Sequence, residues 1–563
     1  MMTRSGDALT HRTYLSAHST HRDPRAGTGA VSDLNSRMTC AAIRSHRPPP
    51  PAASCRVLAA IRSAAVLGIE AFAVTVEVDA APGLPGWTMV GLPSGSVKEA
   101  RERVGAALVN AGFTLPPRRW TVNLSPADVR KDGTAFDLPI AVGVLVASGQ
   151  LDAAMVSGLI FAGELGLDGT IRPIRGALPL ARAARETGAR ALVLPAANAA
   201  EASLLRDVVL APCDTLDALV HELRRHALPT MRPVAPPQSD DEQADFSEVV
   251  GQPLSKRALE IAAAGGHNVY LVGPPGAGKT MLARRLPSIL PPLDDDALLD
   301  VVAIHSVGGI LPAGRVPSRT PPFRAPHHTI SVAGLIGGGP GPRPGEVSLA
   351  HRGVLFLDEL LELPRYALDA MRQPLEDGRV VIARAAHAVA FPARFLLVGA
   401  ANPCPCGFDG DGTGRCRCSL ADINRYRARL SGPLADRIDL HVRVGAVALA
   451  ALGRDTKEES SASIRERVVG ARARQRLRHR ALPGVSCNGD APGRWLQAHA
   501  GLTAESRELL ASAAERLRLS ARAYHRTLRV ARTIADLDGD ERISTGALAE
   551  ALAFRPTESA SQG

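Results

Sequence analysis

One eight-residue stretch of the 563-residue chain limits most strongly what the chain can fold into. Residues 273–280 read Gly-Pro-Pro-Gly-Ala-Gly-Lys-Thr and fit G-x-x-x-x-G-K-[ST], a pattern that requires a strand before it and a helix after it. The apolar run Val269–Val272 precedes the stretch, and the helix-favouring run Met281–Leu286 follows it. This context predicts a phosphate-binding turn; the alternative is a Gly/Pro-rich surface turn.

Each residue type in the stretch suits the binding of a nucleoside triphosphate. Glycines let successive backbone N–H groups point at phosphate oxygens. We expect Lys279 to reach the β and γ phosphates and Thr280 to hold Mg²⁺. The chain has five lysines against 61 arginines, so a lysine here indicates that a compact ammonium is needed. The expected ATP-binding residues are Gly273, Pro274, Pro275, Gly276, Ala277, Gly278, Lys279 and Thr280, with Asp358 further along.

Two later apolar runs end in polar residues that fit the same chemistry. Gly353–Glu359 ends in two carboxylates, of which Asp358 is expected to bind Mg²⁺ and Glu359 to activate the attacking water. Strands often end in solvated acids, but this ending follows the phosphate loop by about eighty residues, which favours a hydrolytic site. Phe395–Asn402 ends in an amide, and Asn402 is the expected sensor of the γ-phosphate.

Arg437 lies in the sequence Asp-Arg-Ile-Asp. Phosphoryl transfer is accelerated by positive charge at the γ-phosphate, so we expect this arginine to act at a neighbouring subunit's site. The alternative is a surface salt bridge to Asp436 or Asp439.

The composition shows where the positive charge lies in the chain and favours one cellular compartment. The net charge is +10, but residues 1–62 hold nine Arg and three Asp, so most of the excess lies in a segment without apolar periodicity. We interpret residues 1–56 as a disordered extension or a mis-assigned start. The apolar run Leu138–Ala147 is too short to span a membrane, and no signal-peptide layout is present. A cytoplasmic protein with reduced or metal-bound cysteines is expected.

Residues 57–225 alternate between strand and helix patterns and predict an α/β domain. The clearest are strands at Ala73–Asp79 and Trp120–Leu124 and a helix at Val97–Ala111. Segments 131–139 and 163–176 resemble the two that carry the Ser-Lys dyad of Lon-type protease domains, which have the ribosomal S5 domain 2-like fold. In that resemblance Ala135 takes the place of the serine and Leu178 falls near the lysine. Without a nucleophile and its base, we expect a non-proteolytic domain.

Further motifs resemble the magnesium-chelatase-like AAA+ family of ComM and YifB proteins over about residues 57–555. The motifs are Phe323–Ser331, Gly334–Gly339, Pro344–Ala350, Asn402–Gly407 and Ala531–Leu537. The resemblance implies an AAA+ P-loop NTPase core with a C-terminal helical lid, in which Arg522 or Arg529 reaches the nucleotide. It also implies a hexameric ring that uses ATP and Mg²⁺ as a DNA helicase in branch migration, in recombination or natural transformation.

These patterns divide the chain into segments. The expected bounds are an extension 1–56, the Lon-like domain 57–225, a Pro-rich linker 226–244, the ATPase core 245–445, a basic helical connection 446–499, the helical lid 500–556 and a tail 557–563.

Two insertions in the core are candidates for a DNA-facing pore. Residues 320–350 are rich in Gly, Pro, His and Arg, and residues 378–391 predict two short strands around a turn. In magnesium-chelatase and MCM-type rings, which this arrangement resembles, such elements project toward the channel. The DNA-contact candidates are Arg324, His327, His328, Arg379, Arg384 and His387. The alternative is that these side chains stabilise the loops or the subunit interface.

Two other basic or metal-ligating clusters leave alternatives open. Cys404, Cys406, Cys416 and Cys418 form C-x-C…C-x-C, which suits tetrahedral Zn²⁺, although free cysteines or a redox pair would give the same sequence. The helical run Arg465–Arg480 holds seven arginines against one glutamate and either lines a DNA path or forms a solvated face.

The favoured function is therefore an ATP hydrolase that moves DNA strands. One alternative is the ATPase subunit of a metal chelatase, which would need a partner with a metal-ion-adhesion domain, since this chain has no evident D-x-S-x-S segment. Another is a protein remodeller or adaptor that uses the Lon-like domain.

Overall fold

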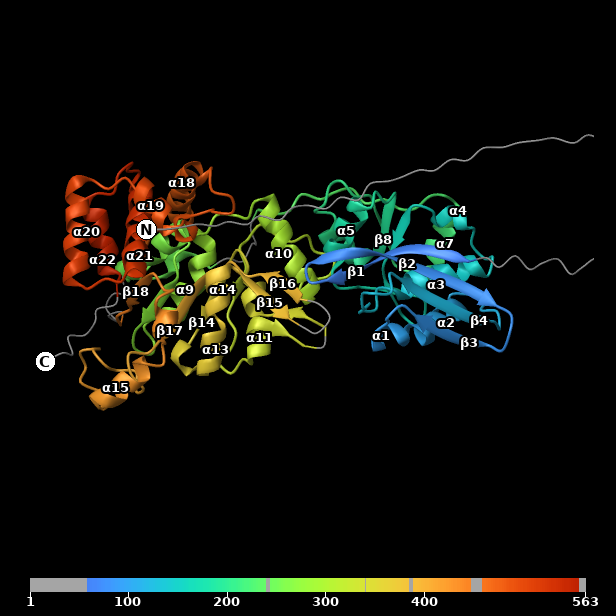
Figure 1. The fold of residues 1–563 in the computed structure, drawn as a ribbon, viewed down its shortest axis with the longest axis horizontal. Coiled ribbons are helices and arrows are strands. Elements are labelled where there is room, and N and C mark those ends of the chain that lie inside the picture. Colours follow the sequence, from blue (N-terminus) through green and yellow to red (C-terminus); the bar gives the residue numbers. More distant parts are fainter. Residues whose placement is uncertain (1–57, 239–243, 340, 384–387, 447–457, 556–563) are drawn as a thin grey trace, which may run out of the picture. The chain divides into compact units, whose positions relative to one another are not determined.

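The computed structural model describes residues 58–238, 244–339, 341–383, 388–446 and 458–555, all within one compact unit. The expected extension 1–56 and tail 557–563 lie outside the described residues. Two large sheets organise the rest, and the α/β prediction is confirmed (Figure 1). Among the described residues, no helix is both long and apolar enough to cross a membrane.

The first sheet has seven strands in the order β3-β4-β2-β1-β5-β8-β9. Their bounds are β1 Ala59–Leu67, β2 Glu70–Ala81, β3 Gly86–Val90, β4 Arg119–Ser125, β5 Leu159–Phe161, β8 Ala191–Pro195 and β9 Leu210–Cys213. β1 and β2 form an antiparallel hairpin, whereas β5, β8 and β9 continue the sheet in parallel. Buried Val74, Val76 and Val78 alternate with less buried neighbours, as expected for a strand covered on one face.

Helices cover this sheet. They are α1 Gly95–Lys98, α2 Ala100–Asn110, α3 Asp137–Ala147, α4 Ala153–Val156, α5 Ala177–Glu186, α6 Ala196–Ala202 and α7 Leu216–Arg224, with a small β6 Glu164–Leu165 and β7 Ile171–Arg172 pair. Every residue of α3 is buried, so the apolar run noted in the sequence is a core helix. The expected helix 97–111 is divided at Glu99 into α1 and α2.

The second sheet holds the phosphate loop. Its five strands are parallel, in the order β11-β14-β17-β10-β18. The bounds are β10 Val269–Val272, β11 Phe323–Arg324, β14 Val354–Leu357, β17 Leu396–Ala401 and β18 Leu440–Arg443. β14 and β17 are buried throughout, which explains their continuous apolar sequences. Because β10, β14 and β17 are neighbours and parallel, the residues that follow them meet at one edge of the sheet.

Around this sheet lie helices and two short hairpins. The helices are α8 Pro253–Gly265, α9 Lys279–Ile289, α10 Asp295–Gly308, α11 Val332–Ile336, α12 Glu346–Leu349, α13 Arg365–Ala370, α14 Arg372–Asp377, α15 Leu420–Arg427 and α16 Gly432–Ala435. The hairpins are β12 Gly337–Gly338 with β13 Arg343–Pro344, and β15 Arg379–Ala383 with β16 Ala388–Pro392. The second hairpin matches the two strands predicted around a turn.

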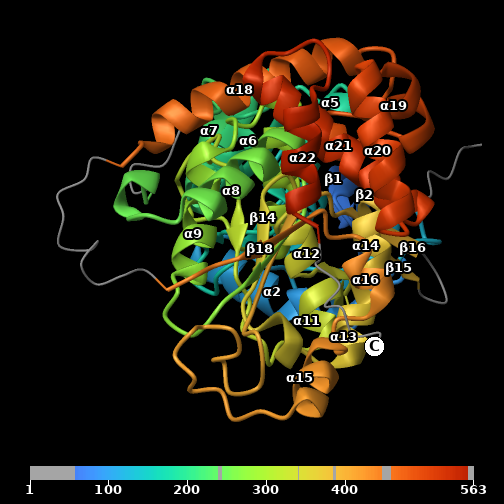
Figure 2. The same cartoon turned by 90° about the vertical axis from the view of Figure 1, so that its left-hand side faces the viewer.

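The C-terminal part is helical. It consists of α18 Ser461–His479, α19 Gly493–His499, α20 Ala504–Arg516, α21 Ala521–Asp538 and α22 Thr545–Ala553. Ser520 caps α21 by accepting from the N–H of Ala523, and Gly539, in the left-handed conformation, ends it. These helices share one hydrophobic core with α8 and the second sheet. Figure 2 shows them gathered on one side of β14 and β18, with α15 on the other side.

Candidate functional site

The phosphate loop joins β10 to α9, as the sequence pattern predicts. Gly276 and Gly278 have φ of +77° and +87°, a left-handed conformation that favours glycine. At Gly273 a Cβ would lie 2.2 Å from the carbonyl oxygen of Val444. Helix α9 begins at Lys279, so its N-terminal N–H groups add partial positive charge at the end of the loop. This backbone can hold a phosphate group.

Lys279 is 9% exposed and is held by three oxygen acceptors. Its Nζ donates to the carbonyl oxygens of Gly273 at 2.6 Å and Pro274 at 3.0 Å, and to Oδ1 of Asn402 at 3.2 Å. Burial lowers the pKa of this ammonium, while nearby carboxylates raise it. The side chain therefore joins the phosphate loop directly to the end of β17.

The two expected magnesium ligands lie against each other. The Oγ1 of Thr280 donates to Oδ2 of Asp358 at 2.8 Å, although 78 positions separate the residues in the chain. A hydroxyl and a carboxylate are the hard oxygen donors that Mg²⁺ accepts alongside phosphate oxygens. The donor set thus fits a magnesium ion bound with a nucleotide.

Glu359 has an unusual backbone for a residue with a side chain. Its φ and ψ are +50° and +44°, and its N–H donates to Oδ1 of Asp358 at 3.0 Å. Its Oε2 lies 2.9 Å from Nδ1 of His328. The sequence predicted His328 as a DNA contact, so its position beside the expected water-activating acid was missed. Left-handed backbone at a non-glycine residue often occurs at functional sites.

One cavity of about 470 Å³ gathers these side chains. It is lined by Pro275, Gly276, Ala277, Gly278, Lys279, Thr280, Met281, Asp358, Glu359, Ala401 and Asn402. All of these except Met281 and Ala401 were predicted from the sequence as residues of the site.

Arg437 and Arg522 do not line that cavity. Both line a second one, of about 550 Å³, and both pair with Glu376: Arg437 Nη2 with one carboxylate oxygen and Arg522 Nη2 with the other, at 3.3 Å. The salt bridge of Arg437 is therefore to Glu376, and the alternative partners, Asp436 and Asp439, were wrong. Arg529 lines the same cavity. Within its own chain, none of the three arginines reaches the phosphate loop.

The basic run 465–480 is partly exposed and partly packed against neighbouring helices. Arg467, Arg474, Arg476 and Arg480 are exposed, whereas Arg465, Arg472 and Arg478 are half-buried. Arg472 donates to the carbonyl oxygen of Ala263, and Arg467 pairs with Glu260. Arg478 pairs with Asp536, which is 0% exposed and also lies 3.0 Å from Arg532. Acids and carbonyls on α8 and α21 therefore hold part of the run, a role that the sequence did not predict, and its exposed arginines leave the solvated face and the DNA path as open alternatives.

In the first insertion, Arg324 and His328 are half-buried against partners within the chain, whereas His327 is exposed. Arg324 donates to both carboxylate oxygens of Glu346, the longer contact being 2.8 Å. The rings of His327 and His328 are tilted at 33° to each other with centroids 4.1 Å apart, and His327 contacts Thr329. These contacts favour the loop-stabilising alternative for this group.

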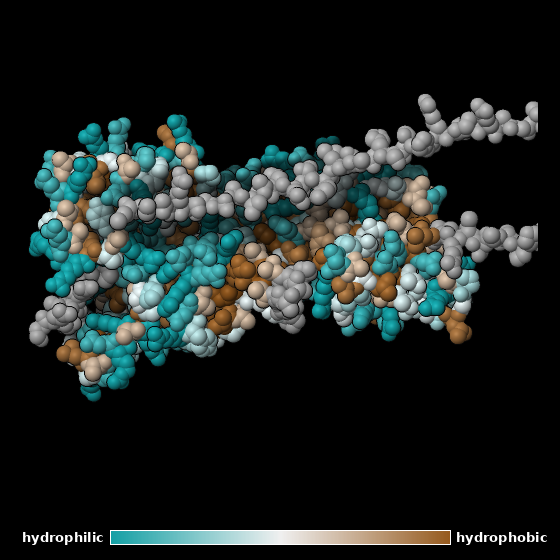
Figure 3. Space-filling model, in the orientation of Figure 1, coloured by the Kyte–Doolittle hydropathy of each residue, from teal (hydrophilic) through white to brown (hydrophobic). Residues whose placement is uncertain are grey.

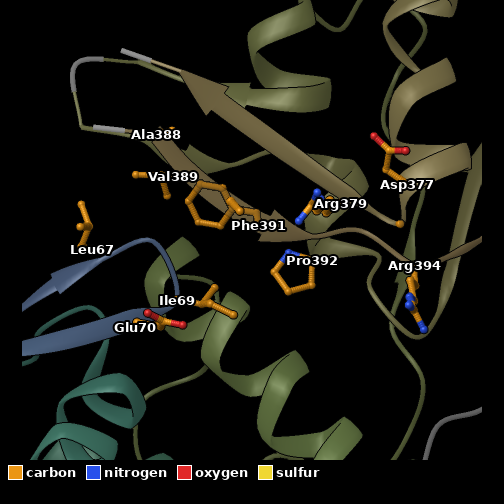
Figure 4. A pocket seen from close by; sticks show the side chains of 12 residues that line it. Leu67, Ile69, Glu70, Asp377, Arg379, Ala388, Val389, Phe391, Pro392 and Arg394 are labelled. Carbon is orange, nitrogen blue, oxygen red and sulfur yellow. The ribbon is translucent and has the colours of Figure 1, made fainter. Parts of the chain in front are cut away.

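The β15–β16 hairpin keeps one candidate exposed. Arg379, at the start of β15, lines a cavity of about 610 Å³ together with Arg394 and the turn between β1 and β2 (Figure 4). The hairpin also exposes an apolar side chain, because Val381 is 40% exposed. Figure 3 shows further apolar side chains on the surface near α11 and α13. The candidates Arg384 and His387 lie outside the described residues.

The remaining candidates concern cysteines and the first sheet. The sulfurs of Cys404, Cys406, Cys416 and Cys418 all lie within 4.8 Å of one another. A backbone N–H donated by Phe408 lowers the pKa of Cys406 to about 6. In the Lon-like pattern, Leu178 is fully buried and the carbonyl of Ala135 accepts from the N–H of Gly163.

The chain is similar to proteins of the magnesium-chelatase type, whose family models cover the phosphate-loop sheet and the C-terminal helices. Three family models match: magnesium chelatase subunit ChlI over residues 245–452, subunit ChlI of Mg-chelatase over 76–198, and the ChlI C-terminal region over 458–555. The competence protein ComM of Haemophilus influenzae is 44% identical over 88% of this chain and 97% of its own length. YifB of Salmonella typhimurium is 43% identical over the same shares. The magnesium-chelatase 38 kDa subunit of Cereibacter sphaeroides is 28% identical over 28% of this chain and 52% of its own.

The matches cover both sheets and the C-terminal helices, and the relatives align over nearly their whole length. With the phosphate-loop cavity, they show that the chain belongs to the ComM/YifB family of magnesium-chelatase-like AAA+ ATPases.

Proposed function

We propose that the chain assembles as a hexameric ring, hydrolyses ATP between neighbouring subunits and uses the energy to move DNA strands. The observation that carries this proposal is the division of the catalytic set between two cavities. Lys279, Glu359 and Asn402 line one cavity, whereas Arg437 lines the other. An arginine at the γ-phosphate greatly accelerates phosphoryl transfer. A ring in which the second cavity faces the first cavity of the next subunit would complete each site.

Within one subunit, position suggests the role of each residue. Lys279 would exchange its present oxygen acceptors for the β and γ phosphates. Glu359 would accept a proton from the attacking water, and Asn402 would orient that water or the γ-phosphate. Thr280 Oγ1 and Asp358 Oδ2 would hold Mg²⁺, which neutralises charge on the phosphate oxygens.

Arg522 is best assigned to the same side of the interface as Arg437. The two guanidinium groups share the carboxylate of Glu376, so a movement that presents one to a neighbour would present the other. We therefore propose that Arg522 acts on the neighbour's nucleotide rather than on its own.

The proposal extends to the surrounding parts of the fold. We assign α20–α22 as the helical lid and α18 and α19 as the basic connection that precedes it. We assign the seven-stranded sheet to a Lon-like domain without proteolytic activity, because Ala135 and Leu178 replace the serine and the lysine. A chain that acts on DNA with ATP would work in the cytoplasm.

The DNA part of the proposal has two supports. One relative is named a competence protein, and we extend that name to strand movement in recombination or natural transformation. On this chain, Arg379 of the β15–β16 hairpin is exposed and available to a phosphate. The match to magnesium-chelatase subunit ChlI over residues 245–452 favours a metal-chelatase ATPase as the second candidate. That function predicts an ATPase rate that DNA does not change.

Subunit mixing tests the shared site. Lys279→Ala and Arg437→Ala are each expected to abolish ATP hydrolysis. In a one-to-one mixture, about one quarter of interfaces would combine an intact Lys279 with an intact Arg437, so ATPase activity should return to about that share of wild type. The matched control is a mixture of Lys279→Ala with Glu359→Gln. Both changes lie on the same side of the interface, so this mixture should stay inactive. Equal recovery in both mixtures, or in neither, contradicts the shared site.

A further inference from the structure

The segment between β17 and α15 brings four thiols together without a hydrophobic core of its own. Residues 403–419 contain no helix or strand. Gly407, Gly410, Gly412 and Gly414 all have positive φ, between +69° and +88°. Pro403 and Cys404 are buried, but no other side chain of the segment is. A segment this long with so few buried side chains and no regular structure needs another source of order.

The sulfur positions match a tetrahedral metal site. Cys404 Sγ lies 3.3 Å from Cys406 Sγ and 3.7 Å from Cys416 Sγ, and Cys406 Sγ lies 3.6 Å from Cys416 Sγ. In a tetrahedron with Zn–S bonds of about 2.3 Å, neighbouring sulfurs are about 3.8 Å apart. Cys418 completes the four, within 4.8 Å of the others. None of these contacts is a disulfide, whose sulfurs are about 2.05 Å apart.

Backbone N–H groups point at the same sulfurs. The N–H groups of Phe408 and Arg417 donate to Cys406 Sγ, that of Cys406 to Cys418 Sγ, and that of Cys418 to Cys416 Sγ. Donors placed in this way stabilise negative charge on sulfur and orient metal ligands. Two other cysteines, Cys213 and Cys487, are buried singly, outside the cluster. Among the residues that the structure describes, thiols therefore converge only in this segment.

We propose that Cys404, Cys406, Cys416 and Cys418 bind one Zn²⁺ as four thiolates, and that the resulting clip braces the phosphate loop. The brace is direct. A Cβ on Gly407 would lie 2.8 Å from Cδ of Pro275 and 3.9 Å from Cγ of Asn402. The far side is held by Arg427, which donates to the carbonyl of Pro403 at 3.1 Å and pairs with Asp409 at 2.6 Å. The effect of the clip on ATP hydrolysis rests on the proposed function, whereas metal binding does not.

Metal content tests the site itself. The full chain, purified without added metal, is expected to carry about one zinc per chain by elemental analysis. Cobalt substitution should give the absorption of a tetrahedral thiolate complex. Cys416→Ser with Cys418→Ser should lose the zinc and the cobalt spectrum, while Cys213→Ser with Cys487→Ser should keep both. A wild-type chain without zinc that also fails to take up cobalt, or one with a disulfide among the four, overturns the site.

Two glycine variants test the brace. Gly407→Ala and Gly410→Ala each place a side chain at positive φ, but a Cβ at Gly410 meets nothing within 4 Å. Both variants should retain zinc. Gly407→Ala should lower the ATP turnover rate at least about tenfold, because misplaced catalytic groups lose rate steeply, and Gly410→Ala should leave it within about twofold. Equal effects of the two variants overturn the brace. A zinc-loaded wild type that never hydrolyses ATP would instead contradict the proposed function.

Discussion

The backbone of Glu359 leads to a prediction in which stability and activity move apart. Substituting Glu359 by alanine or by glycine removes the carboxylate in both cases and should abolish ATP hydrolysis. The two variants differ only in how they fit φ +50° and ψ +44°. Alanine keeps the strain of a side chain in the left-handed region, and glycine removes it.

The size of the difference can be worked out from known contributions. A left-handed non-glycine residue costs about 1–2 kcal/mol, which glycine relieves. Glycine in turn lowers the free energy of unfolding by about 0.4–1 kcal/mol, because it makes the unfolded chain more flexible than alanine does. The loss of the His328 pair, which is half exposed, affects both variants equally. Glycine should therefore be more stable than alanine at position 359 by about 0.5–1 kcal/mol.

Thermal unfolding of the two variants measures this difference. The expected gap is about 1–3 °C in favour of glycine for a domain of this size. Glu466, exposed within α18, provides the control, since glycine should be less stable than alanine there by about 1 kcal/mol. If alanine is as stable as glycine at position 359, or more stable, Glu359 is not strained and this reasoning is refuted.

Three other perturbations have defined outcomes. Asp536→Asn should lower the free energy of unfolding by about 3–5 kcal/mol in denaturant titrations, because it leaves Arg478 and Arg532 without their buried counter-charge. The control is Asp538→Asn on the same helix. Asp538 is 47% exposed, so this change should lower the free energy of unfolding by less than about 1 kcal/mol. Burial lowers the pKa of His351 to about 3, and its Nδ1 accepts a backbone N–H at 3.0 Å. Below about pH 6.5, His351 is protonated in the unfolded chain but not in the folded one, so the free energy of unfolding should fall by about 2 kcal/mol between pH 7 and pH 5. Melting curves of His351→Asn at several pH values should lack this loss. Arg379→Gln should reduce the slope of log DNA affinity against log salt concentration by about 1. Arg324→Gln should leave that slope unchanged and lower the melting temperature. The reverse pattern would contradict a contact between Arg379 and a DNA phosphate.

The sequence was sufficient for the strands that carry the nucleotide site. Val269–Val272, Gly353–Glu359 and Phe395–Asn402 were predictable because buried parallel strands are continuously apolar and their polar ends must meet at one edge. The phosphate loop was predictable because its glycines are needed for its backbone conformation.

Contacts between distant segments could not be predicted where no strand order or motif requires them. His328 meets Glu359 because β11 lies beside β14, and no local pattern encodes that pairing. Arg437 and Arg522 share Glu376 across three segments of the chain. The sequence of α18 did not show that some of its arginines bind acids and carbonyls, because those partners lie on α8 and α21.

The central claim is that ATP hydrolysis at the cavity of Lys279 and Glu359 moves DNA strands. Strand exchange on a four-way DNA junction, compared between wild type and Glu359→Gln at equal ATP concentration, measures this most directly. The account predicts that wild type separates the junction only with ATP and that Glu359→Gln binds ATP and DNA without separating it. The claim would be contradicted if the wild-type protein hydrolysed ATP but neither bound nor moved strands of four-way or forked DNA, and if neither DNA changed its ATPase rate.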